Sequence, residues 1–229
     1  IGPGQYAETV YRENIGGESA QTVIRTAIPG TVLLRGHIPC PPFKEVGVYR
    51  FTYAARVEKA PVAVLELDTQ TSLTHRATAL EVDFKPGSYC YNAEKKTLYV
   101  STSDLQPPSK HRYALSETNR SGFHLDKATR VTIEGITVTG CYPAEEKMHR
   151  FSEHVSGFML NEPKGCVIRR SAAFLNGNGF CMVGGSGNVI EHCEAFGNGT
   201  PFHAPAGNIM RFNPDDDIIR DCRAHDSAW

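Results

Sequence analysis

Residues 158–177, FMLNEPKGCVIRRSAAFLNG, and residues 180–199, FCMVGGSGNVIEHCEAFGNG, follow one pattern, and their first residues lie 22 positions apart. Two further segments keep the same offsets: residues 123–140, FHLDKATRVTIEGITVTG, and residues 209–227, IMRFNPDDDIIRDCRAHDS. Self-similarity at a fixed period is typical of repeat architectures, in which each unit buries its apolar face against its neighbours. We therefore expect these segments to stack.

The four segments share aligned columns of residues. Each begins with a large apolar residue and carries an isoleucine ten positions later. Asn176 and Asn198 also align, beside glycines, so we expect an asparagine ladder at a corner that needs left-handed backbone. The columns that we expect to be buried are Phe123, Phe158, Phe180 and Ile209; Ile133, Ile168, Ile190 and Ile219; and Val138, Ala173, Ala195 and Ala224.

The spacing of the repeats decides between helices and strands. Short apolar runs separated by Gly, Asn, Asp and Pro are typical of strands joined by turns, whereas a helical repeat needs longer runs with apolar residues three and four apart. About 22 residues per turn, with strands stacked about 4.8 Å apart, predicts an all-β fold, a right-handed parallel β-helix.

The middle of the chain breaks this pattern. Residues 37–116 contain strand-like pieces of antiparallel character, among them ATALEVDF at 77–84 and a hairpin, YCYNAEKKTLYV, at 89–100. Such strands at short spacing predict a small β-sandwich. The expected organisation is therefore first β-helix strands at 1–36, a β-sandwich insertion at 37–116, and further β-helix turns at 117–229.

Composition excludes several classes of partner. The chain has 24 basic and 25 acidic residues, which argues against electrostatic binding to nucleic acid or a membrane surface. No run of 18 apolar residues predicts a membrane span. The seven cysteines lack metal-ligand spacing; the aligned Cys193 and Cys222 are expected to be small buried side chains or, alternatively, a stacked disulfide. Because the sequence ends at Trp229 directly after a repeat, without a cap, we expect a fragment of a longer protein.

Two segments resemble a known group of proteins. Residues 1–36, IGPGQYAETVYRENIGGESAQTVIRTAIPGTVLLRG, resemble the opening of pectate-lyase-like β-helix proteins, and PGSYCYNAEKKTLYVSTSD at 86–104 resembles a sandwich segment inserted in some β-helix glycosidases. The nearest likeness is to the glycoside hydrolase family 120 β-xylosidases. This resemblance implies a β-helix with an inserted sandwich and activity on glycosides. It implies catalytic carboxylates in later turns of the β-helix, and no position of this sequence matches them.

Outward side chains of the stacked strands offer a candidate binding groove. If Phe123 and Leu125 point inward, then His124 and Asp126 point out, because side chains alternate along a strand. The same alternation exposes Met159 and Asn161 in the second repeat, and Cys181 and Val183 in the third. In the fourth repeat it turns Arg211 inward, so we expect a bulge that releases Arg211 to the surface. The predicted substrate-binding residues are His124, Asp126, Asn161, His203 and Arg211.

An acidic turn, Asp215–Asp217, lies at the expected edge of this groove. It has three interpretations: a solvated turn, a Ca²⁺ site made of three carboxylates, or an acid and base pair, with Asp215 and Asp216 as the candidate catalytic residues. The only cofactor expected, if any, is Ca²⁺. No Ser/His/Asp order, phosphate loop or zinc spacing is present.

These features predict an extracellular or periplasmic carbohydrate-active protein, a glycoside hydrolase or polysaccharide lyase that acts on a polysaccharide or oligosaccharide. A long stacked surface with repeated polar positions suits a long repetitive ligand. The alternative is a non-catalytic β-helix, an adhesin, surface-layer or filament component, in which the repeats form a rigid rod and the protein self-assembles.

Overall fold

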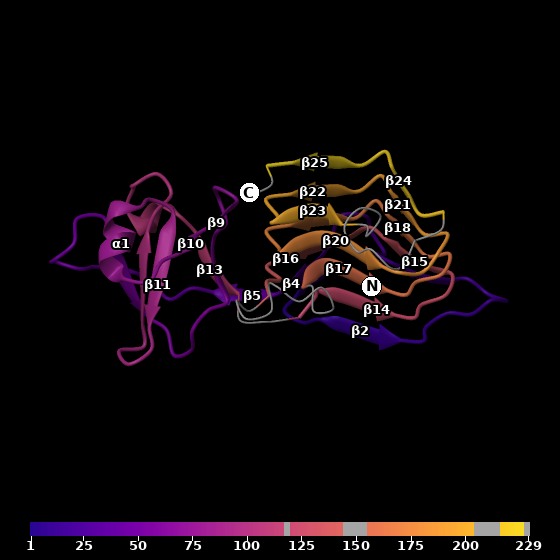
Figure 1. Ribbon diagram of the computed structural model, residues 1–229, viewed down its shortest axis with the longest axis horizontal. Helices are drawn as coiled ribbons and strands as arrows, with labels where there is room; N and C mark the ends of the chain where they lie inside the picture. The colour runs from indigo at the N-terminus through magenta and orange to yellow at the C-terminus, as the bar shows by residue number, and fades with distance from the viewer. Residues whose placement is uncertain (117–119, 144–154, 204–215, 227–229) are drawn as a thin grey trace. The chain divides into compact units, whose positions relative to one another are not determined.

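The computed structural model describes residues 1–116, 120–143, 155–203 and 216–226. The chain divides into two compact units. Residues 1–36 and 118–229 form one, which we call the parallel unit, and residues 37–117 form the other, the antiparallel unit. In the described residues, the elements of both units are β-strands apart from one short α-helix and one 3-10 helix (Figure 1).

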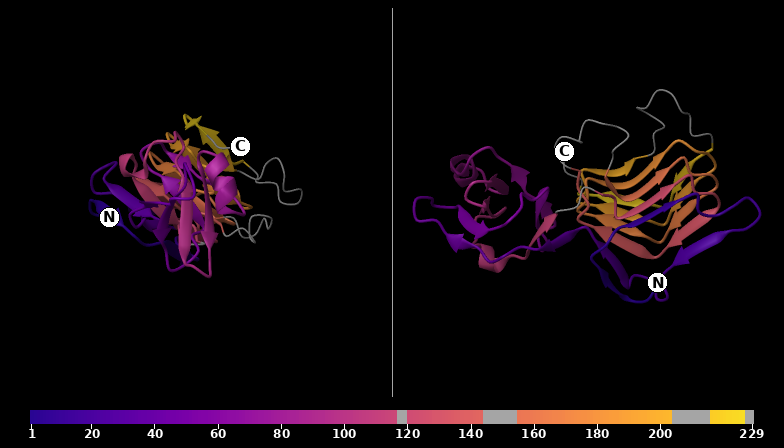
Figure 2. Two further views of the ribbon diagram at one scale, coloured as in Figure 1. Left: turned by 90° about the vertical axis from the view of Figure 1, so that its left-hand side faces the viewer. Right: turned by 90° about the horizontal axis from the view of Figure 1, so that it is seen from below.

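The parallel unit consists of three parallel sheets, and the chain passes through them in turn, one strand per sheet in each circuit (Figure 2). Sheet 1 contains β2 (Val10–Glu13), β14 (Phe123–Asp126), β17 (Ser156–Asn161), β20 (Asn178–Val183) and β23 (Thr200–His203). Sheet 2 contains β3 (Thr22–Arg25), β15 (Val131–Glu134), β18 (Val167–Arg169), β21 (Val189–Glu191) and β24 (Ile218–Arg220). Sheet 3 contains β1 (Gly4–Tyr6), β4 (Val32–Arg35), β16 (Ile136–Thr139), β19 (Ala172–Phe174), β22 (Glu194–Phe196) and β25 (Arg223–His225).

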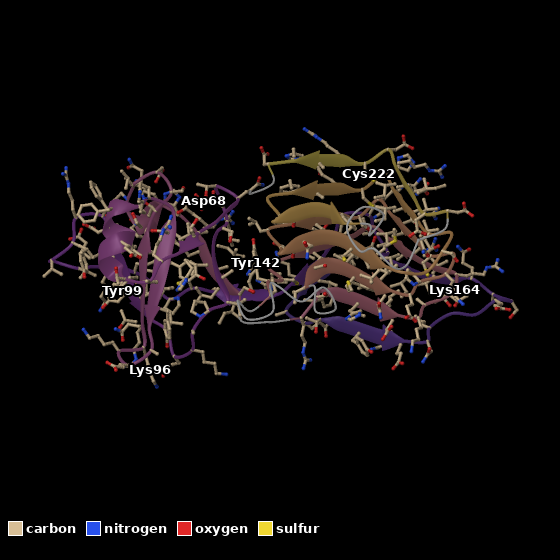
Figure 3. The ribbon with its side chains drawn as sticks, viewed as in Figure 1. Asp68, Lys96, Tyr99, Tyr142, Lys164 and Cys222 are labelled. Atoms are coloured by element: carbon tan, nitrogen blue, oxygen red, sulfur yellow. The ribbon has the colours of Figure 1, made fainter. Side chains whose placement is uncertain are left out.

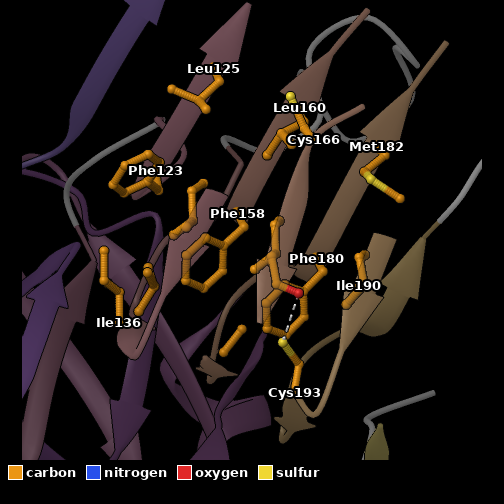
Figure 4. Close-up of a cluster of buried hydrophobic side chains, with 14 of the residues drawn as sticks. Phe123, Leu125, Ile136, Phe158, Leu160, Cys166, Phe180, Met182, Ile190 and Cys193 are labelled. Carbon is orange, nitrogen blue, oxygen red and sulfur yellow. Dashed lines mark hydrogen bonds between the residues drawn. The ribbon is translucent and has the colours of Figure 1, made fainter. Parts of the chain in front are cut away.

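The predicted columns form the core between the three sheets. Phe123 pairs with Phe158, and Phe158 with Phe180, in the register of sheet 1; all three are fully buried (Figure 4). The rings of Phe158 and Phe180 stack with centroids 4.8 Å apart. Ile133, Ile168, Ile190, Val138, Ala173 and Ala195 are also fully buried, which confirms those positions of the columns. Phe202 rather than Ile209 continues the phenylalanine column, because Phe202 pairs with Phe180; Ile209 lies outside the described residues.

Two predicted core residues, Ile219 and Ala224, are exposed instead of buried. Ile219 is 43% exposed, although it pairs with Ile190 as expected. Its strand β24 is the edge strand of sheet 2. A stacked column buries a side chain only when strands lie on both sides, and within the described part of the chain β24 has a neighbour on one side only.

The cysteine column contains no disulfide. All seven cysteines are free thiols. Cys193 is 2% exposed, and its thiol donates to the carbonyl oxygen of Ile168 in the preceding circuit, 3.6 Å away (Figure 4). The expectation of small buried side chains is confirmed for Cys193, and the stacked disulfide is wrong.

The corners between sheets use left-handed backbone and buried amides. The asparagine ladder forms as predicted, since Asn176 and Asn198 are fully buried and hydrogen bonded to each other. The left-handed residues are not the asparagines, however. They are the preceding ones, Leu175 with φ of 50° and Gly197 with φ of 58°. The amides therefore satisfy the backbone groups that the bend leaves unpaired.

The antiparallel unit contains two sheets around a second core. The five-stranded sheet has the order β10 (Thr74–His75), β11 (Ser88–Asn92), β12 (Thr97–Ser101), β7 (Tyr53–Arg56) and β6 (Lys44–Glu45). The four-stranded sheet has the order β5 (His37–Pro39), β13 (Tyr113–Ser116), β8 (Ala63–Glu66) and β9 (Thr71–Ser72). Val64 and Leu115 of the smaller sheet join Leu98 and Val100 of the larger one in the core. The predicted hairpin is present as β11 and β12.

One segment that we expected to be a strand is a helix. α1 spans Ala79–Phe84 inside ATALEVDF, and a 3-10 helix spans Pro108–Lys110. Thr78 accepts a hydrogen bond at its Oγ1 atom from the Glu81 backbone N–H, 3.2 Å away, and Glu81 accepts one at Oε2 from the Ala77 N–H. This resembles a capping box, except that Glu81 accepts from the N–H of Ala77, the residue before the N-cap, instead of from the N-cap N–H. The apolar alternation of the segment hid the Thr-x-x-Glu signal that predicts a helix start.

Candidate functional site

The outer face of sheet 1 carries most of the predicted groove. His124 and Asp126 flank the fully buried Leu125 on β14 and are themselves half-buried, as the alternation predicted. Asn161 of β17 is Asp126's partner in the parallel register, and it is also half-buried. The structure therefore brings His124, Asp126 and Asn161 together on one face.

Asp126 and Asn161 form a direct contact. The Asn161 Nδ2 atom donates a hydrogen bond to Asp126 Oδ1, 2.9 Å away. This bond fixes the orientation of both side chains. Within the described residues it leaves Asp126 Oδ2 and Asn161 Oδ1 as two acceptors side by side, an arrangement that accepts hydrogen bonds from neighbouring hydroxyl groups.

His124 adds a ring with an unused nitrogen. Its Nε2 atom is buried and has no hydrogen-bond partner among the described residues. The ring meets Tyr11 of β2 edge-on, with centroids 5.1 Å apart. Burial lowers the pKa of His124 below its ordinary value, against the opposing charge of Asp126. The imidazole is therefore neutral at neutral pH and offers one donor and one acceptor.

The sequence analysis did not predict two residues of this site. Tyr11 is 50% exposed and pairs with His124, and Glu13 pairs with Asp126. The signal was available, because VYRE at 10–13 aligns with FHLD at 123–126. Residues 1–36 are expected to form the first β-helix strands, but VYRE was not aligned with the four repeats, since its opening residue is valine instead of phenylalanine.

Two residues that we expected to be exposed are buried. Met159 is 4% exposed and Cys181 is fully buried, although both follow the outward register of sheet 1. Alternation sets the direction of a side chain, not its exposure, and these two lie on central strands with neighbours on both sides. Burial raises the pKa of the Cys181 thiol to about 12, so it is not a nucleophile at neutral pH.

The remaining predicted residues lie in or beside segments that the structure does not describe. His203 is in β23 in register with Cys181, but its side chain is outside the described set, as are Arg211 and Asp215. Asp216 is exposed, with φ of 68°. The calcium and acid–base interpretations of this turn stay predictions.

Asp217 has a structural role in the described part of the turn. Its Oδ1 atom accepts hydrogen bonds from the Asn188 backbone N–H and side-chain amide, at 2.8 and 2.9 Å. Asn188 in turn accepts from the Cys166 N–H. Within the described residues, Asp217 thus ends a second polar ladder that continues through Asn188 to Cys166. In the described residues no cluster of three or more His, Cys, Asp or Glu side chains is arranged to hold a metal ion.

The outer face of sheet 2 is a ladder of alternating charge. Arg25, Glu134, Arg169, Glu191 and Arg220 occupy successive strands in one register column. Glu134 pairs with Arg169 at 2.9 Å, and Glu191 with Arg220 at 2.6 Å. Each carboxylate of the column is paired with an arginine, so this face offers no free carboxylate from the column to a cationic ligand.

The outer face of sheet 3 carries a ladder of rings. Phe174 stacks on Phe196 with centroids 4.9 Å apart, and Phe196 stacks on His225 at 5.1 Å. A sugar ring binds to the face of an aromatic ring, and here the faces of neighbouring rings already cover one another. Tyr11, which meets its neighbour edge-on, keeps a face available.

Comparisons with known proteins give a fold likeness. No protein-family model matches the sequence, and no curated protein sequence does. A structure described as a glycoside hydrolase matches 99% of this chain and 65% of its own, with a TM-score of 0.61 and 11% identity. The structure of XylC in complex with xylose matches 86% of this chain and 48% of its own, with a TM-score of 0.54 and 10% identity.

These matches show a shared fold and no more, because the identities are low. The chain spans 65% of the first structure and 48% of the second, less than two thirds of either. In the described part of the chain no helix has the length and apolarity needed to cross a bilayer.

Proposed function

We propose that the parallel unit is a right-handed parallel β-helix, interrupted by a β-sandwich formed by the antiparallel unit. The three parallel sheets visited in turn, with columns in register across circuits, support this proposal. The likeness to a glycoside hydrolase structure over nearly the whole chain supports it further.

We propose that the protein is an extracellular or periplasmic carbohydrate-active protein that binds a glycan on the outer face of sheet 1. The observation that carries the proposal is the grouping of Tyr11, His124, Asp126 and Asn161 on that face. A sugar ring has an apolar C–H face and a rim of hydroxyl groups. Tyr11 offers an aromatic face, the half-buried His124 ring packs against it, and the Asp126–Asn161 pair offers two acceptors.

We propose further that the reaction is hydrolysis of a glycosidic bond, with Glu13 and Asp126 as the carboxylate pair. The two residues are register partners on adjacent parallel strands, which lie about 4.8 Å apart. Glycosidases use two carboxyl groups separated by about 5–10 Å, one as acid and the other as nucleophile or base. The hydrogen bond from Asn161 orients Asp126, and Glu13 is exposed and free to reach a leaving-group oxygen.

The test is an assay of reducing-sugar release and of unsaturated product from a panel of polysaccharides, xylan among them. We expect reducing ends without unsaturated product, because hydrolysis forms none. Asp126→Asn and Glu13→Gln should each lower kcat by about 100-fold or more, whereas Glu162→Gln, an exposed carboxylate at the next corner, should not. Loss of activity in Asp215→Asn or Asp216→Asn, with Asp126→Asn fully active, would move the acid and base to the acidic turn.

A further inference from the structure

The antiparallel unit contains a buried polar cluster that takes no part in the proposed glycan site. Glu66, at the end of β8, is fully buried. It accepts hydrogen bonds from the Tyr113 hydroxyl at 2.5 Å and the Thr69 hydroxyl at 2.7 Å. It also accepts from the hydroxyl and the backbone N–H of Ser103. These contacts join the segment after β8 to the segment after β12.

His111 lies beside Glu66, and both of its ring nitrogens face carboxylates. Its Nδ1 atom is 2.8 Å from Asp68 Oδ2, and its Nε2 atom is 3.1 Å from Asp104 Oδ1 (Asp68 is labelled in Figure 3). An ionised carboxylate only accepts hydrogen bonds, and a neutral imidazole has a single N–H. This geometry therefore requires both nitrogens to carry a proton. The side chain of His111 is 6% exposed, whereas those of its partners Asp68 and Asp104 are 32% and 47% exposed.

The cluster holds three segments together. Asp68 follows β8 and also accepts from the Arg112 backbone N–H at 2.8 Å. Asp104 follows β12 and also accepts from the Gln106 N–H at 2.9 Å. His111 precedes β13. Among the described residues no lysine or arginine side chain forms a salt bridge with Glu66, Asp68 or Asp104, so the imidazolium is the cation of the cluster.

We propose that His111 is a protonation-dependent latch, which holds residues 67–71 and 102–112 of the antiparallel unit together and releases them when the ring loses one proton. The groups that face it are Glu66, Asp68, Asp104 and the ring of Tyr113, whose hydroxyl donates to Glu66. A neutral ring keeps only one of its two hydrogen bonds and leaves three carboxylates without a cation.

The electrostatics agree with this geometry. Burial by itself lowers the pKa of His111, but the hydrogen bond to Asp68, the charge of Glu66 and the hydrogen bond to Asp104 raise it above its ordinary 6.5 overall. The pKa of Asp104 is lowered by its hydrogen bonds from Gln106 and His111. A raised histidine pKa contributes stability that is complete below 6.5 and is lost as pH rises through the folded value. A lowered aspartate pKa contributes stability that is lost as pH falls through its folded value.

The test combines an NMR titration of the His111 ring with amide hydrogen exchange of Ser103 and Arg112, whose N–H groups bond to the cluster. We expect the pKa of His111 to lie above 6.5. The equilibrium constant for opening should grow about tenfold per pH unit between 6.5 and the folded pKa, and it should level off above the folded pKa. His111→Gln should remove this pH dependence, and His75→Gln, an exposed histidine of the same unit, should retain it. A His111 pKa of 6.5 or below would overturn the proposal, and this measurement needs only the unmodified protein. So would an unchanged pH profile in His111→Gln.

Discussion

Asn176 donates a hydrogen bond from its side-chain amide to Asn198 Oδ1, 3.1 Å away, and the same oxygen accepts the backbone N–H of Asn176 at 3.0 Å. The side-chain amide of Asn198 donates a hydrogen bond to the carbonyl oxygen of Ala173, 2.8 Å away. Each amide therefore ties one circuit of the parallel unit to the circuit before it, and it does so where the backbone bends between sheets.

Replacing Asn176 with alanine should lower the free energy of unfolding by about 1–3 kcal/mol or more, because the change leaves buried backbone groups without partners. The Cys141 N–H is one of these groups, since it donates to Asn176 Oδ1. The measurement is urea denaturation. The control is Asn178→Ala, since Asn178 is half-buried and its side chain makes a single bond of 3.3 Å to Val155. Equal losses in the two variants would contradict a specific role for the ladder.

Replacing Gly157 with alanine should destabilise the parallel unit through lack of space. A Cβ atom at this position would lie 2.9 Å from the Gly179 carbonyl oxygen and 3.1 Å from the Ala173 Cβ. Overpacking of this kind costs about 1–3 kcal/mol. Gly17→Ala is the control, because a Cβ there meets nothing within 4 Å. A thermal melt in which Gly157→Ala matches the unmodified protein would refute this reading of the core.

The repeat was visible in the sequence because burial in stacked columns restricts residue type. Phe158 and Phe180 sit in equivalent surroundings one circuit apart, so the same side chain fits both. Exposure was less predictable, since it depends on what flanks a strand. Met159 and Cys181 point outward yet are buried, and Ile219 points inward yet is exposed.

The candidate site was predicted in part. Asp126 and Asn161 are 35 residues apart but are both fourth in their aligned repeats, so the repeat alignment placed them in register, although it did not predict their hydrogen bond. Tyr11 and Glu13 belong to a circuit separated from β14 by the whole antiparallel unit. The His111 cluster joins three loops, and loop contacts leave no periodic pattern.

Replacing Thr78 with alanine should lower the stability of the antiparallel unit by about 1 kcal/mol, because Thr78 caps α1. Thr78→Ser should restore most of the loss, since serine presents the same oxygen to the Glu81 N–H. Chemical denaturation followed by a probe in the antiparallel unit measures both variants. A serine variant as unstable as the alanine variant would argue that the threonine methyl group, not the cap, matters.

His124 should titrate below 6.5, the ordinary value for histidine, because burial lowers its pKa more than the charge of Asp126 raises it. In this case the unfolded chain binds the proton more readily than the folded one. The free energy of unfolding should therefore fall as pH drops below 6.5. Above pH 6.5 the titration of His124 should not change it. NMR titration of the ring measures the value directly. Titration at or above 6.5 would show that the ring is less buried than the structure indicates.

Glycan binding on the outer face of sheet 1 is tested most directly by NMR titration with xylose and xylo-oligosaccharides, alongside neutral and acidic oligosaccharides of other kinds. The account predicts saturable shifts at the Tyr11 ring, the His124 ring and the Asn161 side-chain amide with at least one of these sugars, and their loss in Asp126→Ala. Absence of saturable shifts with every sugar, or shifts confined to the antiparallel unit, would contradict it.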